Sequence, residues 1–184
     1  AQKTIRHRRT REAIRNGVAY TPADRKAEGL ATTLSVQKNI GMPILNSNRG
    51  QIIYLKKLTL AVEQQVKNLR IKVTSHQMKT VNLSGGNQQK IVIGKWLGVN
   101  PKVLILDEPT RGIDVESKME IYTILRDLSN SGVGVMVLSS DLIELIGLCD
   151  RMIIFFEGRI TGELGNEEFS EEKIMAYAHE IGVD

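Results

Sequence analysis

The sequence has little of the chemistry that crosslinks a chain or inserts it into a membrane. Cys149 is the only cysteine among 184 residues, so no internal disulfide can form, which suits a protein of a reducing compartment. No apolar run approaches the ~20 residues that a membrane-spanning helix requires. With 41% hydrophobic and 25% charged residues, the composition predicts a globular chain of one domain, with or without a subdomain.

Aromatic residues are also scarce, at 4% of the chain, and none is interleaved with the one cluster of basic residues. Clustered basic side chains can contact nucleic acid or an anionic membrane, but base stacking needs aromatic side chains. We therefore interpret the cluster as a solvated face and expect no nucleic-acid partner. Its members are Arg6, His7, Arg8, Arg9, Arg11 and Arg15.

Apolar periodicity predicts an α/β chain. Steps of three and four between apolar residues predict an amphipathic helix over 51–73. A shorter helix over 36–40 is expected to end at Gly41-Met42-Pro43, because proline disrupts a helix interior. Unbroken apolar runs at 103–106 and 133–138 predict strands that are buried on both faces.

The remaining elements follow from shorter patterns. Alternation of strands and helices at this spacing predicts a parallel sheet. The expected strands are 3–5, 18–21 before Pro22, the buried strand 152–156, and 159–161, which pairs with it around Glu157-Gly158. The expected helices are a turn at 10–14, a helix capped by Asp114 through Leu128, a helix at 142–146 and a terminal helix over 170–181.

A serine and two glycines stand directly in front of a run with helical periodicity. The stretch is Leu83-Ser84-Gly85-Gly86-Asn87-Gln88-Gln89-Lys90. Glycine lets backbone N–H groups come close to a ligand, and a helix N-terminus adds unpaired donors and partial positive charge. The stretch therefore predicts a phosphate site, and a turn that only caps a helix is the alternative.

Two adjacent carboxylates, Asp107 and Glu108, follow the apolar run at 103–106. In parallel α/β sheets, ligands bind beyond the carboxyl ends of the strands. One carboxylate can hold Mg²⁺ through water, and the other can orient or deprotonate an attacking water. The alternative interpretation is an ordinary acidic loop.

Together these stretches resemble the motifs of ATP-binding cassette (ABC) proteins. Residues 83–90 resemble the signature motif, residues 103–110 resemble the Walker B segment, and Arg111-Gly112-Ile113-Asp114 resembles the D-loop. The residues of the signature-like stretch and of the D-loop-like stretch are similar to those in the second cassette of tandem sugar-import ATPases of the ribose, galactose and xylose type. The resemblance extends over about residues 14–164. It implies an α/β fold of the P-loop NTPase type, with a parallel sheet flanked by helices, an α-helical subdomain, and a short C-terminal hairpin and helix.

The resemblance implies that one group of residues faces a partner cassette. Ser84, Gly85 and Gly86 would contact the γ-phosphate of an ATP held by that cassette, and Gln88 would support the contact. Asp114 would cross the interface between the two cassettes.

A second group would serve this chain's own nucleotide, with ATP and Mg²⁺ as cofactors. The resemblance implies that Asp107 holds Mg²⁺ through water, that Glu108 is the general base, and that Ser140 stands at the switch position. The family usually has histidine after serine there, whereas this chain has Ser139-Ser140. A hydroxyl can form a hydrogen bond but cannot stabilise phosphate as an imidazole can.

Two further departures affect the expected activity. The family's P-loop, Gly-x-x-x-x-Gly-Lys-[Ser/Thr], does not occur in the sequence. We therefore expect a fragment of a longer protein that begins just after that loop, and we expect the fragment alone to be inactive. At the Q-loop, Ala23 occupies the position of the usual Gln or Glu, and Asp24 is a candidate substitute.

The resemblance implies an ATPase that energises sugar import from the cytoplasmic face of the inner membrane, bound peripherally to permease subunits. Its partners would be a second cassette, the permease and, indirectly, a sugar-binding protein. The expected parts are a cassette segment at 1–30, a helical subdomain at 31–98, and an α/β core with the terminal helix at 99–184. Two alternatives stay open: a degenerate, non-catalytic regulatory or dimerisation cassette, and a soluble ABC ATPase of DNA repair or translation.

Overall fold

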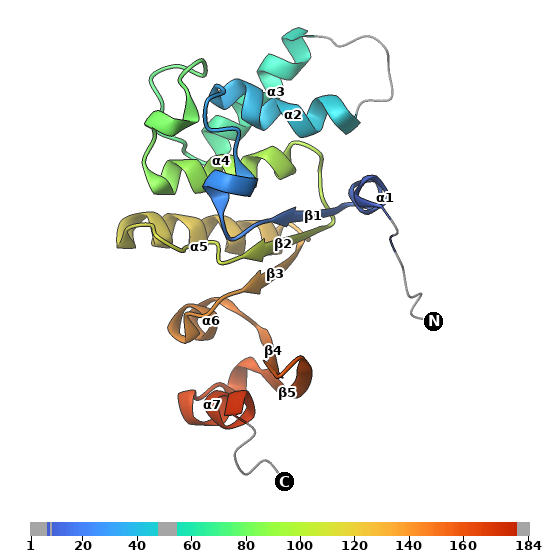
Figure 1. Ribbon diagram of the computed structural model, residues 1–184, viewed down its shortest axis with the longest axis vertical. Coiled ribbons are helices and arrows are strands. Elements are labelled where there is room, and N and C mark those ends of the chain that lie inside the picture. Colours follow the sequence, from blue (N-terminus) through green and yellow to red (C-terminus); the bar gives the residue numbers. More distant parts are fainter. Residues whose placement is uncertain (1–6, 8, 48–54, 180–184) are drawn as a thin grey trace. The chain divides into compact units, whose positions relative to one another are not determined.

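The computed structural model describes residues 7, 9–47 and 55–179, shown as coloured ribbon in Figure 1. They divide into two compact units, Ala1–Leu138 and Ser139–Asp184. The expected strand at 3–5 lies outside the described residues. Across the described residues, no helix has both the length and the apolar character needed to cross a bilayer.

A parallel three-stranded sheet forms the base of the first unit. Its strands are β1 (Val18–Thr21), β2 (Val103–Asp107) and β3 (Gly134–Leu138), in the spatial order β1-β2-β3. In the central strand β2, Ile105 lies beside Tyr20 of β1 on one side and beside Met136 of β3 on the other. Helix α5 (Val115–Asn130) connects β2 to β3, so the expected parallel α/β architecture is confirmed.

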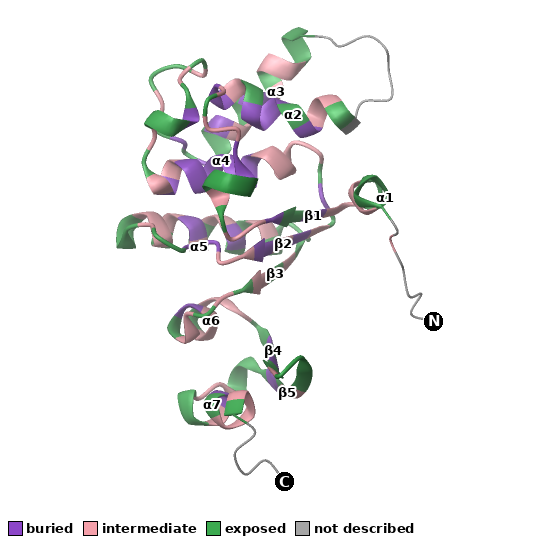
Figure 2. Cartoon of the chain, in the orientation of Figure 1, coloured by how far each residue is buried: buried purple, intermediate pink, exposed green. Residues whose placement is uncertain are grey.

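Helix α4 (Gly85–Leu97) is the buried centre of the first unit. Figure 1 shows α2 (Val36–Ser47) and α3 (Leu55–Asn68) on one side of α4, and β1 and α5 on the other. Ile91, Val92 and Ile93 have no exposed surface, and Figure 2 shows buried positions along α4. Because α4 is covered on both sides, the residues at its N-terminus are held in place by the core.

The expected end of the helix at residues 41–43 is wrong, because α2 continues through Pro43 to Ser47. Proline lacks the N–H that an internal helical position donates, so tertiary contacts must offset that loss. Val36 and Ile40 are fully buried, and the buried Asn39 amide donates to the carbonyl oxygens of Ala31 and Ser35. The packing of α2 against α3 and α4 therefore outweighs the local preference of the sequence.

The helix expected over 51–73 is described from Leu55 and ends at Asn68, while residues 51–54 lie outside the described part of the chain. Its end is set by Arg70, whose φ of 49° is left-handed, and Ile71 N–H then donates to the carbonyl oxygen of Val66 at 2.9 Å. This hydrogen bond satisfies a carbonyl oxygen in the last turn of α3 and so caps the helix. Three short helices complete the unit: α1 (Thr10–Arg15), η1 (Arg25–Gly29) and η2 (Thr80–Asn82).

The expectation of strands buried on both faces is wrong for β3. Its residues alternate between exposed and half-buried, and Met136 and Leu138 are 47% and 43% exposed. Within the described sheet, β3 pairs with β2 alone, so it is an outer strand. In β2, Leu104 and Leu106 have no exposed surface while the alternate residues are half-buried. An apolar run by itself does not distinguish a central strand from an outer one.

The second unit is a hairpin packed against helices. It contains α6 (Leu142–Leu148), β4 (Arg151–Phe156), β5 (Arg159–Gly165), η3 (Asn166–Glu168) and α7 (Glu171–His179). The expected turn is confirmed, since Glu157 and Gly158 are both left-handed, with φ of 45° and 79°. Strand β4 is buried on one face only, because Met152 and Ile154 join the small core while Phe155 is 58% exposed. The expectation that residues 152–156 form a buried strand is therefore wrong for one face.

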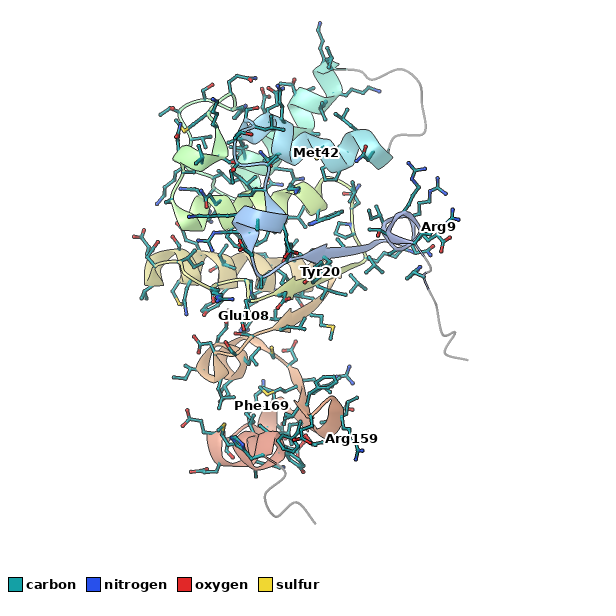
Figure 3. The ribbon with its side chains drawn as sticks, in the orientation of Figure 1. Arg9, Tyr20, Met42, Glu108, Arg159 and Phe169 are labelled. Carbon is teal, nitrogen blue, oxygen red and sulfur yellow. The ribbon has the colours of Figure 1, made fainter. Side chains whose placement is uncertain are left out.

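The basic cluster is described in part. Arg9, Arg11 and Arg15 are exposed on or beside α1, as expected of a solvated face; Figure 3 labels Arg9. Arg6 and Arg8 lie outside the described residues. Cys149 is half-buried, and burial is the main cause that raises the pKa of its thiol.

Candidate functional site

Ser84 is the N-cap of α4. Its Oγ accepts a hydrogen bond from the Asn87 backbone N–H at 3.4 Å and from the Asn87 side-chain amide at 3.0 Å. Gly85 and Gly86 are therefore the first residues of the helix, whereas the sequence pattern predicted them in front of it. Ser84 is exposed, and Gly86 is buried. An exposed cap at a helix N-terminus offers N–H donors to an anion.

Gly86 lies where α4 and α5 approach each other closely. A Cβ added to Gly86 would lie 2.2 Å from Ser117 Oγ and 2.4 Å from Ser117 Cβ. Atoms cannot approach so closely without displacement, so this position needs glycine for helix packing. The packing explanation is independent of any ligand.

Replacing Gly86 by alanine should lower the free energy of unfolding by about 1–3 kcal/mol, because the new methyl overpacks against Ser117. The matched control is Gly134→Ala, since a Cβ there meets its nearest atoms at an ordinary 3.5 Å. Denaturant unfolding followed by the fluorescence of Trp96, the only tryptophan, measures both variants in the same unit. Ser117→Gly should reduce the cost of Gly86→Ala. Equal costs with and without Ser117 would contradict the packing explanation.

Gln88 faces the protein interior and is 3% exposed. Its Nε2 donates to the carbonyl oxygen of Thr80 at 3.0 Å. The neighbouring Asn87 Oδ1 accepts from Lys72 N–H at 2.8 Å. These hydrogen bonds attach the first turn of α4 to the segment that precedes it. Gln88 thus supports the Ser84 cap from the buried side of the helix.

Asp107 and Glu108 lie at the carboxyl end of β2, as expected. The Tyr20 hydroxyl donates to Asp107 Oδ2 at 2.9 Å, and this hydrogen bond is the main cause that raises the pKa of Tyr20. Glu108 has a left-handed φ of 46°, and its N–H donates to the carbonyl oxygen of Leu138 at 2.8 Å. Few non-glycine residues adopt this conformation, and those that do are concentrated at functional sites. Figure 3 labels Tyr20 and Glu108.

The carboxylates fit a magnesium ion only if other ligands complete its shell. Among the described residues, no group of three or more His, Cys, Asp or Glu side chains is placed to hold a metal. Magnesium prefers oxygen ligands and keeps several waters, with one or two carboxylates and substrate phosphates around it. The half-buried Asp107 suits that arrangement.

Asp114 is the N-cap of α5. It accepts hydrogen bonds from the Ser117 backbone N–H at 2.9 Å and from Ser117 Oγ at 2.8 Å. The backbone hydrogen bond is the main cause that lowers the pKa of Asp114. Ser117 therefore contacts the Asp114 cap and also packs where Gly86 needs space. Ser117 therefore links the signature stretch at Gly86 to Asp114 at the end of the loop over 111–114.

Two residues that the sequence analysis did not single out join this site. Arg25 donates from Nη1 to the carbonyl oxygen of Arg111 at 2.6 Å and from Nη2 to that of Gly112 at 3.2 Å. Tyr20 contacts Asp107, as described above. The neighbouring Asp24 accepts from the N–H groups of Lys26 and Ala27, and these bonds lower its pKa. The only sequence signal for Arg25 was that it lies two residues after Ala23, the Q-loop position.

Ser140 is exposed and lies in the second unit, just before α6. The preceding Ser139 donates from Oγ to Glu144 Oε2 at 2.6 Å and accepts from Asp141 N–H at 3.0 Å. Glu144 is buried, so this pair fixes the backbone that leads into Ser140.

Comparisons with known proteins agree with this geometry. The model of the ABC transporter family matches residues 1–111. A ribose import ATP-binding protein of Oceanobacillus iheyensis is 47% identical over 169 residues, which cover 91% of this chain and 34% of the relative. A xylose import ATP-binding protein of Thermoanaerobacter pseudethanolicus is 48% identical over 165 residues, covering 89% and 33%. The chain thus spans about a third of the length of these relatives.

A solved structure shares the fold. It is a dimeric, post-hydrolysis ATP-binding cassette bound to ADP and phosphate, with a TM-score of 0.72 at 21% identity. The match covers 88% of this chain and 69% of that one. Fold, motifs and family match point to the same conclusion: this chain belongs to the ABC transporter family.

Proposed function

We propose that this chain is part of an ATPase that energises sugar import, and that its signature stretch acts on an ATP held by a partner cassette. The observation that carries the proposal is the start of α4. Ser84 is exposed there, while Gly86 and Gln88 behind it are buried. Such a rigid helix N-terminus can present donors to a γ-phosphate without reorganising. The names of the ribose and xylose relatives support sugar as the cargo.

On the chain's own side, Asp107 would hold Mg²⁺ through water, and Tyr20 would orient the Asp107 carboxylate through their hydrogen bond. Bound Mg²⁺ would neutralise charge on the phosphates of ATP. Glu108 would accept the proton of the attacking water. Ser140 would donate a hydrogen bond to the nucleotide, and Asp114 would cross to the partner cassette.

The proposed partners follow from this assignment. A second cassette would bind against Ser84–Gly86 and Asp114. Permease subunits would dock on the helical part at 31–98 and near Asp24, and the protein would then lie peripherally on the cytoplasmic face of the inner membrane. A sugar-binding protein would act through the permease.

The two ATP sites of such a pair would be unequal. By the family resemblance, Ala23 and Ser140 replace side chains that usually assist hydrolysis at the chain's own site, whereas the signature stretch keeps Ser84, Gly85 and Gly86. We therefore assign the main contribution of this chain to hydrolysis in trans. The same substitutions favour the rival function, a regulatory cassette without catalytic effect.

A hybrid protein tests the proposal. In it, this chain replaces the matching 169 residues of the Oceanobacillus ribose import ATP-binding protein. Assembled with the relative's permease in vesicles, the hybrid protein should hydrolyse ATP and drive uptake of ribose. A hybrid protein that folds and binds ATP but shows no ATPase activity would contradict the proposal and favour the regulatory cassette.

A further inference from the structure

The Arg25 side chain joins three segments that are distant in the sequence. Its guanidinium donates to the carbonyl oxygens of Arg111 and Gly112, at 2.6 and 3.2 Å. Both carbonyls belong to the loop between β2 and α5, where Gly112 has a left-handed φ of 66°. A tight loop of this kind has few backbone partners of its own, so the guanidinium supplies the donors that its carbonyls need.

The same guanidinium lies directly over the start of α4. A Cβ added to Gly85 would lie 2.8 Å from Arg25 Nη2, 3.2 Å from Ile113 Cγ2 and 3.3 Å from the carbonyl oxygen of Gly112. Gly85 therefore leaves the space that Arg25 and the loop occupy. Arg25 thus lies against the signature stretch at Gly85 while it is hydrogen-bonded to the loop over 111–114.

The chemistry of arginine suits this place better than that of lysine. A planar guanidinium presents several N–H donors at fixed angles and can bind two acceptors at once, whereas an ammonium is a compact point charge. Arg25 begins η1, and Asp24 caps that short helix, which fixes where the side chain starts. Arg25 Nε is buried without a hydrogen-bond partner among the described residues, so its two terminal nitrogens make the attachment.

We propose that Arg25 is a positioning residue that holds the loop over 111–114 against the start of α4, so that Asp114 and Ser84-Gly85-Gly86 reach a partner as one rigid surface. The structural part of this inference stands on contacts within this chain. Its kinetic consequence rests on the proposed function, and the experiments below separate the two.

Amide hydrogen exchange in the 184-residue chain tests the structural part. The reporters are Arg111 N–H, which donates to Glu108, and Ile113 N–H, which donates to Thr110. Arg25→Lys and Arg25→Ala should speed their exchange roughly tenfold or more, because charge-assisted hydrogen bonds to the loop are lost. Lys26→Ala, the exposed neighbouring cation, should leave both rates unchanged.

General destabilisation is distinguished by the amides of β2, which should keep their exchange rates in the Arg25 variants. Wild-type exchange at Arg111 and Ile113 in Arg25→Lys would overturn the inference, and so would equal acceleration throughout β2. Gly85→Ala should also speed exchange in the loop. In the Arg25→Ala background it should add less, because the closest atom that the new methyl meets is gone.

The kinetic part uses the hybrid protein. Arg25→Lys should lower kcat for ATP about tenfold and change KM for ATP less than twofold, because a misplaced surface affects the transition state more than nucleotide loading. Equal effects on kcat of Arg25→Lys and Lys26→Ala would overturn the kinetic part. An inactive wild-type hybrid protein would refute the proposed function instead, and the exchange experiment would still decide the role of Arg25.

Discussion

In the hybrid protein, Gly85→Ala should reduce ATP turnover by about 100-fold, the loss typical when a transition-state contact is removed. Glu108→Gln should reduce it by about tenfold or less, well below the loss expected for the base of an efficient site. The added methyl at Gly85 meets Arg25, Ile113 and Gly112 within 3.3 Å, so the signature surface must shift. The smaller effect at Glu108 follows from the proposal that Ala23 and Ser140 weaken the site that Glu108 would serve.

Steady-state ATPase assays at saturating ATP measure both variants. Gly134→Ala is the control for a methyl added to glycine, because its nearest neighbours lie at an ordinary 3.5 Å and it is outside the proposed site. Equal losses for Gly85→Ala and Glu108→Gln, or a larger loss for Glu108→Gln, would refute the assignment in trans. A loss at Gly134→Ala as large as that at Gly85→Ala would show that the effect is general overpacking.

The second large effect is expected at the buried cation of α4. Lys90 is 1% exposed, and its Nζ donates to Glu120 Oε2 at 2.6 Å and to the carbonyl oxygen of Arg70 at 3.2 Å. Glu120→Ala should lower the free energy of unfolding by about 3 kcal/mol, because the ammonium is left buried without its counter-charge. Lys90→Met should cost less, about 1 kcal/mol, since methionine fills a similar volume without charge.

Denaturant unfolding followed by Trp96 fluorescence measures this pair as well. In the wild-type chain the Glu120 side chain is 28% exposed and has Lys72 at 3.8 Å, so Lys90→Met leaves Glu120 with water and a second cation. The control is Glu116→Ala, which removes an 83% exposed partner of Lys72 and should change stability by less than about 0.5 kcal/mol. A cost for Lys90→Met equal to that for Glu120→Ala would contradict this account.

The same pair gives a pH dependence with a definite sign. The hydrogen bond from Lys90 is the main cause that lowers the pKa of Glu120 in the folded protein. A carboxyl whose pKa is lower folded than unfolded contributes stability above its unfolded pKa, and that contribution is lost as the pH falls through the folded pKa. The difference in stability between the wild-type chain and Glu120→Ala should therefore shrink in acid. A difference that grows as the pH falls would refute this.

Local patterns in the sequence were sufficient for much of the fold. The apolar run before Asp107 predicted β2, Asp114 predicted the cap of α5, and Glu157-Gly158 predicted the β4–β5 turn. Each depends on backbone preferences or side-chain periodicity within a few residues, which hold wherever the segment lies. The motifs also predicted the ABC family, because the signature, Walker B and D-loop stretches follow one another in the order that is typical of that family.

Only the tertiary structure decided which of these preferences prevailed. Pro43 lies inside a helix because the packing of α2 against α3 and α4 offsets a missing hydrogen bond. Strand β3 is exposed because β2 alone pairs with it in the described sheet. The roles of Gly86 against Ser117 and of Arg25 against Gly112 depend on contacts between residues that are 31 and 87 positions apart. No spacing or propensity encodes such contacts, since they arise only when α4, α5 and the Arg25 segment pack together.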